Sequence, residues 1–140
     1  MNQKTDLVCV HPNFHGRERH DYVLVAAGDG EHFFAQLLYV FGVFIQNTTR
    51  HMALIIPMDK HIPRQERVAL DETFRFSRVC TQHVSASAFI DVESIVCGAV
   101  LVKANDTENH DEYISFDVID EDMWWRMKSV KLVTHPVALR

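Results

Sequence analysis

Apolar residues along this chain recur mainly with a period of two, the spacing of a β-strand that buries one face. The segment DYVLVAA (21–27) is predicted to be such a strand, and it ends at Gly28-Asp29-Gly30, where two glycines can take a positive φ. The next segment, 31–46, is apolar for too long to alternate cleanly, so a buried helix is an alternative to a strand. Its Gly42 and its aromatic and β-branched residues favour a long bent strand. Five of its residues are expected to share one face: Phe33, Ala35, Leu37, Tyr39 and Phe41.

Shorter strands separated by turns are predicted along the rest of the chain. After a turn at 47–50 they cover 51–57, which Pro57 ends, then 73–79, two strands within 88–104 joined by a corner at 91–94, and 108–119. The intervening segment 58–72 is polar and is expected to be a loop.

The last predicted element is a short helix from Asp120 to Met127. The Asp120 carboxylate can accept hydrogen bonds from the first free amides of that helix. The expected fold is therefore mainly β, a partly open barrel or sandwich of about seven strands with a short C-terminal helix. The core is expected to contain Phe33 or Phe34, Leu37, Ile55, Phe76, Ile95, Val100 and Phe116.

Length and composition predict one domain that spans residues 1–140. Gly and Pro are scarce, so the chain is expected to fold nearly end to end. The first residues do not resemble a signal peptide, and no apolar run approaches the roughly 20 residues that cross a bilayer, so we expect an intracellular protein without a membrane partner. Cys9, Cys80 and Cys97 are odd in number and far apart, which predicts reduced thiols.

Charge is distributed unevenly between the two parts of the chain. Residues 1–80 hold nine Lys and Arg against nine Asp and Glu, whereas 81–140 hold five against ten. The segment 104–122 has eight acids and no Lys or Arg. Because a net basic face supplies most of the non-specific affinity for DNA, nucleic acid is not the first expectation for a partner.

The segment HPNFHGRERH (11–20) raises the question of a metal site. Three histidines, His11, His15 and His20, stand close in sequence, and Cys9 could supply a fourth ligand. Pro12 and Gly16 break the helix that would align two of the histidines, so we expect a polar surface loop instead. We therefore predict neither a metal nor another cofactor.

No residue set in the sequence fixes a catalytic reaction. Cys80 and His83 are close in sequence, but no third residue can be named that would orient the histidine. The serines lie in no G-x-S-x-G segment, and the Gly28–Gly30 turn does not precede a helix that could bind phosphate. We expect a protein that is not an enzyme.

Several segments of the chain resemble the bromo-adjacent homology (BAH) domain. They are FFAQLLYVF (33–41), TFRFSRVCTQHVSASAFIDVESIVCGAVLVK (73–103) and YISFDVID (113–120), with DVESIVCG (91–98) in the place of a characteristic BAH segment. The chain is also similar, over about 14–127, to the β-rich C-terminal module of transposase-like proteins of mushroom-forming fungi, including its VIDEDMWWRM (118–127). The resemblance implies a BAH-like β domain in a nuclear, chromatin-associated setting. Where some BAH domains place part of an aromatic cage for methyl-lysine, residues 53–59 hold no aromatic residue.

These observations predict a non-catalytic protein-interaction module, and the resemblance implies that it derives from a mobile-element protein. An exposed Trp beside acidic residues would suit a basic tail, so the candidate contact residues are Trp124, Trp125, Asp120 and Asp122. The alternative is an accessory nucleic-acid-binding domain that uses Lys60, His61, Arg64, Arg67, Arg75 and Arg78. The sequence leaves the identity of the partner and the oligomeric state open.

Overall fold

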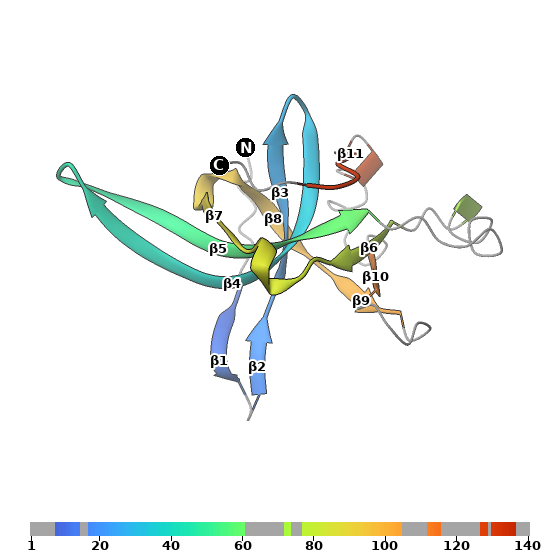
Figure 1. Ribbon diagram of the computed structural model, residues 1–140, viewed down its shortest axis with the longest axis horizontal. Coiled ribbons are helices and arrows are strands. Elements are labelled where there is room, and N and C mark those ends of the chain that lie inside the picture. The colour runs from blue at the N-terminus through green and yellow to red at the C-terminus, as the bar shows by residue number, and fades with distance from the viewer. Residues whose placement is uncertain are drawn as a thin grey trace, which may run out of the picture.

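The computed structural model shows an open, mainly antiparallel β-sheet from which hairpins project (Figure 1). It describes residues 8–14, 17–60, 72–73, 77–104, 112–115, 127–128 and 130–136, with only the backbone described at 11–14 and 17–19.

The described residues form eleven strands and two short 3-10 helices, with further helical residues at 72–73 and 127–128. The prediction of a mainly β fold is therefore confirmed. The strands are β1 (Val10–Phe14), β2 (Arg17–His20), β3 (Tyr22–Gly28), β4 (Glu31–Ile45), β5 (Thr48–Lys60), β6 (Arg78–Thr81), β7 (Ala88–Asp91), β8 (Ile95–Ala99), β9 (Leu101–Lys103), β10 (Glu112–Ser115) and β11 (Lys131–Leu132), and the 3-10 helices are η1 (Val84–Ala86) and η2 (Val92–Ser94).

Nine of these strands belong to one sheet. Seven lie in the order β8-β3-β4-β5-β6-β10-β9, while β7 pairs with β5 and β11 pairs with β4. In the described part of the chain the two end strands, β8 and β9, do not pair, so the sheet stays open. The remaining strands, β1 and β2, form a separate hairpin that projects from the sheet (Figure 1).

The centre of the sheet is buried on both faces. One face carries the core residues Val23, Val25, Phe33, Ala35, Leu37, Ala53 and Ile55. The other carries Leu24, Phe34, Met58, Val79 and Cys97. Because β3 and β4 contribute to both clusters, their sequences are almost continuously apolar, as expected for strands covered on two sides.

A β-bulge at Leu38 divides β4 into two parts with opposite facing. Leu37 pairs with Ile55, whereas Tyr39 pairs with Leu54, which is the neighbour of Ile55 in the chain. Since adjacent strand residues point to opposite faces, the extra residue moves Tyr39 to the face opposite Leu37. The prediction that residues 33 to 41 share one face at every second position is therefore wrong beyond Leu37.

The end of the described chain is built into the sheet. Residues of β11 pair in parallel with Glu31 and His32 at the start of β4. The Val133 amide donates to the His32 carbonyl (2.9 Å), and the Lys60 amide at the end of β5 donates to the Thr134 carbonyl (3.0 Å). The segment 131–134 thus lies between the beginning of β4 and the end of β5.

Several predicted boundaries need correction. The surface loop expected at 11–20 is a β-hairpin, β1 and β2, with Val10 opposite His20. The strand expected from 73 starts later, since 72–73 are helical and β6 begins at Arg78. The turn expected at 47–50 is shorter, because β5 already begins at Thr48. Pro57 does not end this strand as expected, since β5 continues to Lys60 where the loop 58–72 was predicted to begin.

The predicted core was partly correct. Phe33, Phe34, Leu37 and Ile55 are buried, and Ile95 packs against the first cluster while remaining partly exposed. Val100 is 51% exposed, because it falls in the break between β8 and β9 rather than inside a strand. Phe76 and Phe116 lie outside the described residues, as does the helix expected from Asp120 to Met127 except for Met127 itself, which is helical.

Candidate interaction surface

The most prominent surface feature is the two-stranded end of the β4–β5 hairpin, which extends beyond the rest of the sheet (Figure 1). β3 last pairs with β4 at Gln36, and β7 last pairs with β5 at Met52. Among the described residues, positions 38–51 therefore pair with no strand outside this hairpin, although β1 and β2 come close to part of β4. We call residues 38–51 the ribbon.

A tight turn closes the ribbon. Gln46 and Asn47 have φ values of 49° and 62°, and they connect the paired residues Ile45 and Thr48. Positive φ at both central residues is the conformation of a two-residue hairpin turn whose twist matches that of the flanking strands. Asn tolerates this region well, so Asn47 is the local sequence signal for the turn.

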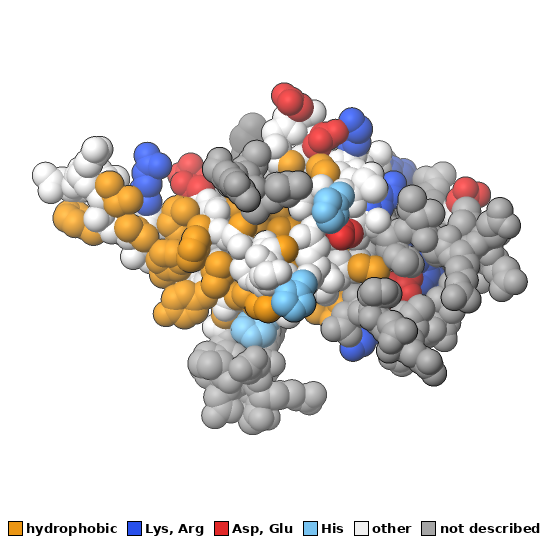
Figure 2. Space-filling model, in the orientation of Figure 1, with side chains coloured by type: hydrophobic (Ala, Val, Ile, Leu, Met, Phe, Trp, Pro, Cys, Tyr) orange, Lys and Arg blue, Asp and Glu red, His pale blue; other side chains and the backbone are white. Residues whose placement is uncertain are grey.

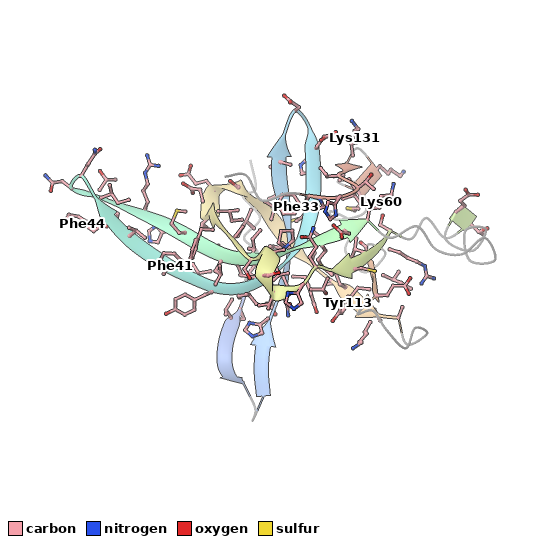
Figure 3. The ribbon with its side chains drawn as sticks, viewed as in Figure 1. Phe33, Phe41, Phe44, Lys60, Tyr113 and Lys131 are labelled. Carbon is pink, nitrogen blue, oxygen red and sulfur yellow. The ribbon has the colours of Figure 1, made fainter. Side chains whose placement is uncertain are left out.

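Large apolar side chains are exposed along the ribbon. Tyr39 is 60% exposed and Phe44 is 71% exposed, and Val40 and Ile45 are also exposed. Figure 2 shows hydrophobic side chains gathered over this part of the molecule, and Figure 3 places Phe44 near the tip and Phe41 closer to the body. From Leu38 to Thr49 the ribbon carries no charged residue. Several large apolar side chains exposed together on one projecting element typically mark a contact site.

Three aromatic rings form a cluster at the base of the ribbon. The Tyr39 and Phe41 rings are stacked with centroids 6.1 Å apart, and the Phe41 and Phe89 rings meet edge to face at 5.7 Å. Phe89 comes from β7 and is itself 60% exposed. Tyr39 and Phe89 both lie beside Leu54 in register, so they share one face of the sheet. We call Tyr39, Phe41 and Phe89 the aromatic cluster.

An open polar hollow of about 470 Å³ lies beside the ribbon where it joins the body. Its lining contains both signs of charge: Thr48, Thr49, Arg50, His51, Asp91, Val92 and Glu93. The Asp91 carboxylate accepts a hydrogen bond from the Glu93 amide (2.9 Å) and so caps η2. We assign no ligand to this hollow.

Most of the contact residues expected from the sequence lie outside the described residues. These are Trp124, Trp125, Asp120 and Asp122 for a protein partner, and His61, Arg64, Arg67 and Arg75 for nucleic acid. Of the expected basic contacts, Lys60 and Arg78 are described. Lys60 is exposed, whereas the Arg78 guanidinium lies 3.1 Å from the Glu112 carboxylate, with side chains 10% and 2% exposed. Arg78 therefore has a structural ion pair where a phosphate contact was expected.

Cys80 lies between two acidic residues in the sheet. Asp59 is its register partner on β5, and Glu112 is its partner on β10. Burial of the thiol, with the negative charges of Glu112 and Asp59, raises the pKa of Cys80 above its ordinary value. A nucleophilic cysteine needs the opposite shift, because the thiolate is the reactive form.

The histidines near this cysteine have structural contacts. His83 Nδ1 accepts from the Ser85 amide (3.2 Å) and caps η1. His135 Nδ1 lies 2.7 Å from Asp59 Oδ1, which also accepts from Gln82 Nε2 (2.6 Å). These contacts hold η1 and the segment after β11 against the sheet.

The proposed alternative of a metal site is only partly covered by the structure. Within the described residues, no group of three or more His, Cys, Asp or Glu side chains is placed to hold a metal ion. The side chains of His11 and His15 are outside the described set, so the expectation for this segment stays a prediction. In the part of the chain that the structure describes, no helix has the length and apolar character needed to cross a membrane.

Comparison with known proteins gave no relative. No protein-family model matches the sequence, no curated protein matches it, and no solved structure matches it. The resemblance to BAH domains and to fungal transposase-like proteins thus stays a prediction from the sequence.

The aromatic cluster was not anticipated from the sequence. Tyr39 and Phe41 were expected on one face with Leu37, and Phe89 was treated only as part of a short strand. A usable signal was present in the length of the apolar strand. Fifteen strand residues extend about 50 Å, while a compact domain of this size is only about 37 Å across. One end of β4 therefore had to project into solvent with its apolar residues.

Proposed function

We propose that this chain is a non-catalytic protein-interaction module whose contact surface is the ribbon with the aromatic cluster. The observation that carries the proposal is the exposure of Tyr39 and Phe44 on the ribbon, together with that of Phe89 on the adjoining strand β7. Aromatic side chains are the commonest anchors of protein interfaces, because they bury much apolar surface at a small cost in conformational entropy.

The backbone of the ribbon suits the same role. A strand without a neighbour offers unpaired amide and carbonyl groups to an extended segment of a partner, while its side chains supply specificity. Because residues 38–49 carry no charge, the contact should be mainly apolar and depend weakly on salt. A basic tail bound at acidic residues would instead show a strong salt dependence.

The proposal can be tested with a surface variant that leaves the core intact. The immobilised protein is incubated with extract of the cells that make it, and retained proteins are quantified by mass spectrometry. Tyr39→Lys/Phe44→Lys places charges on both faces of the ribbon and should reduce capture of the specific partner at least about tenfold. Val102→Lys adds a charge at an exposed valine on β9, remote along the sheet, and is the matched control.

The thermal unfolding of all three proteins is compared first, to ensure that lost capture does not reflect unfolding. Selective loss in the ribbon variant, retained at high salt, would support the proposed function. Equal capture by all three proteins, or capture that disappears on raising the salt concentration, would refute it.

A further inference from the structure

The free edge of β4 is suited to a particular partner. We propose that a second copy of this chain pairs with it, antiparallel, about a two-fold axis at Gly42. This inference rests on the proposed function, since it identifies the partner of the same surface. The two sheets would join through β4 into one continuous sheet.

The edge is open from Leu38 to the turn. Beside Asp21, the residue before β3, the Leu37 amide of β4 still donates a hydrogen bond to the Asp21 carbonyl (2.9 Å). Beyond this bond, β4 pairs with β5 on one side as far as Ile45, and in the described residues no strand pairs with its other side, although β1 and β2 come close to part of β4. Natural edge strands are usually protected by Lys, Pro or a covering segment. Residues 38–45 contain neither Lys nor Pro.

The sequence of this edge is complementary to itself. A two-fold axis perpendicular to the sheet at Gly42 places Tyr39 opposite Ile45, Val40 opposite Phe44, and Phe41 opposite Val43 of the other copy. Every pair is apolar, so no charge is brought against a like charge. The rotation keeps each residue on its own face, so the Tyr39 and Phe41 rings of both copies lie on the same face of the joined sheet.

The position of the axis follows from the limits of the open edge. An axis at Phe41 would bring Ile45 opposite Leu37, whose amide is already bonded to Asp21. An axis at Gly42 uses residues 39–45 and ends at the turn. It is the register that fills the open edge without meeting that bond.

The exposed area predicts a reversible dimer. The exposed parts of Tyr39, Val40, Phe44 and Ile45 offer roughly 400 Å² per copy, taking about 200 Å² for an aromatic and about 120 Å² for an aliphatic side chain. Edge-to-edge pairing buries only part of the roughly 800 Å² that two copies offer, because the side chains stay on the open faces of the joined sheet, and about 1,200 Å² is the lower end of specific interfaces. A weak, reversible dimer is therefore expected.

Two measurements on the purified protein test the pairing. Sedimentation velocity over rising concentration should show a monomer–dimer equilibrium for the wild type and for Val102→Lys. In Tyr39→Lys/Phe44→Lys the association should weaken at least about tenfold. Gly42→Cys should form a covalent dimer under mild oxidation, because residues on the axis of an antiparallel pair have Cα atoms about 4.5–5.5 Å apart.

The cysteine variant has suitable controls. A Cβ added at Gly42 would have Thr49 Cγ2 as its nearest neighbour, at 3.4 Å, so a side chain fits with little adjustment. Val102→Cys, on β9 at the end of the sheet, and the wild type with its three native cysteines give the background of cross-linking.

The possible outcomes separate the two proposals. A concentration-dependent dimer that is lost in the ribbon variant, with cross-linking specific to Gly42→Cys, supports self-pairing. A monomer at every concentration without specific cross-linking overturns it. If ribbon-dependent capture of a different protein is then observed, the proposed function still holds. If neither is observed, both proposals fail.

Discussion

Leu37→Ala should destabilise the protein about twice as much as Tyr39→Ala, although the two residues lie only two positions apart on one strand. Leu37 is 2% exposed in the first core cluster. Its truncation removes three carbon atoms, or about 2.4 kcal/mol of transfer free energy at about 0.8 kcal/mol each. The cavity left behind brings the expected loss to about 3–4 kcal/mol.

Tyr39 lies past the bulge and is 60% exposed. Only the buried part of its side chain contributes, about 1 kcal/mol, and the stacked ring of Phe41 adds about 0.5–1 kcal/mol. The expected loss is therefore about half that at Leu37.

Urea unfolding followed by circular dichroism provides the measurement, at one low protein concentration so that self-association contributes little. With a slope of about 2 kcal/mol per M, Leu37→Ala should lower the unfolding midpoint by about 1.5–2 M and Tyr39→Ala by less than about 1 M. Equal losses, or a loss below about 1 kcal/mol at Leu37, would refute the change of face at Leu38.

Three further outcomes are expected. Glu112→Gln removes the charge beside the buried Arg78 guanidinium and should lower the free energy of unfolding by about 3 kcal/mol in chemical denaturation. Arg78→Met/Glu112→Leu should restore much of that stability, and an equally unstable double variant would contradict the reasoning. The raised pKa of Cys80 should keep its alkylation slow until the pH exceeds the ordinary thiol pKa of 9.0, as measured by peptide mass spectrometry. Asp59→Asn should lower the pKa of Cys80 and speed its labelling, and an unchanged pH profile would count against the electrostatic cause. Gly28→Ala should cost about 1–2 kcal/mol, because its φ is 93° although no atom lies within 4 Å of an added Cβ, and Gly28→Asn should cost less; a neutral Gly28→Ala would show that the turn relaxes.

The local signals in the sequence predicted the central strands well. The apolar run 22–27 and the Gly28–Gly30 turn located β3, although it is buried on both faces, and the aromatic and β-branched content of 31–46 correctly favoured a strand over a helix. The corner at 91–94 was also found, because Asp91 caps η2 through its own side chain. These features depend on interactions between residues close in sequence.

Features that depend on distant residues were not predictable in the same way. The bulge at Leu38 arises from the register with β5, and it decides which face Tyr39 occupies. The ion pair of Arg78 requires Glu112, 34 positions further along the chain. The sequence around Arg78 thus suggested a surface contact, because the order of the strands, which buries Arg78 beside Glu112, cannot be seen locally.

The docking of β11 has a consequence for how the chain folds. Lys131 contacts Glu31 across 100 positions of sequence. The first residues of β4 can therefore pair fully only after β11 has been synthesised. At a synthesis rate of about 5–20 residues per second, this interval is about 5–20 s on the ribosome. During that time the backbone groups of Glu31 and His32 that later bond to β11 and Val133 remain unprotected. Closure of so long a loop also makes this contact one of the slower steps of refolding, and amide exchange at Val133 should become protected after the β3–β4 hairpin.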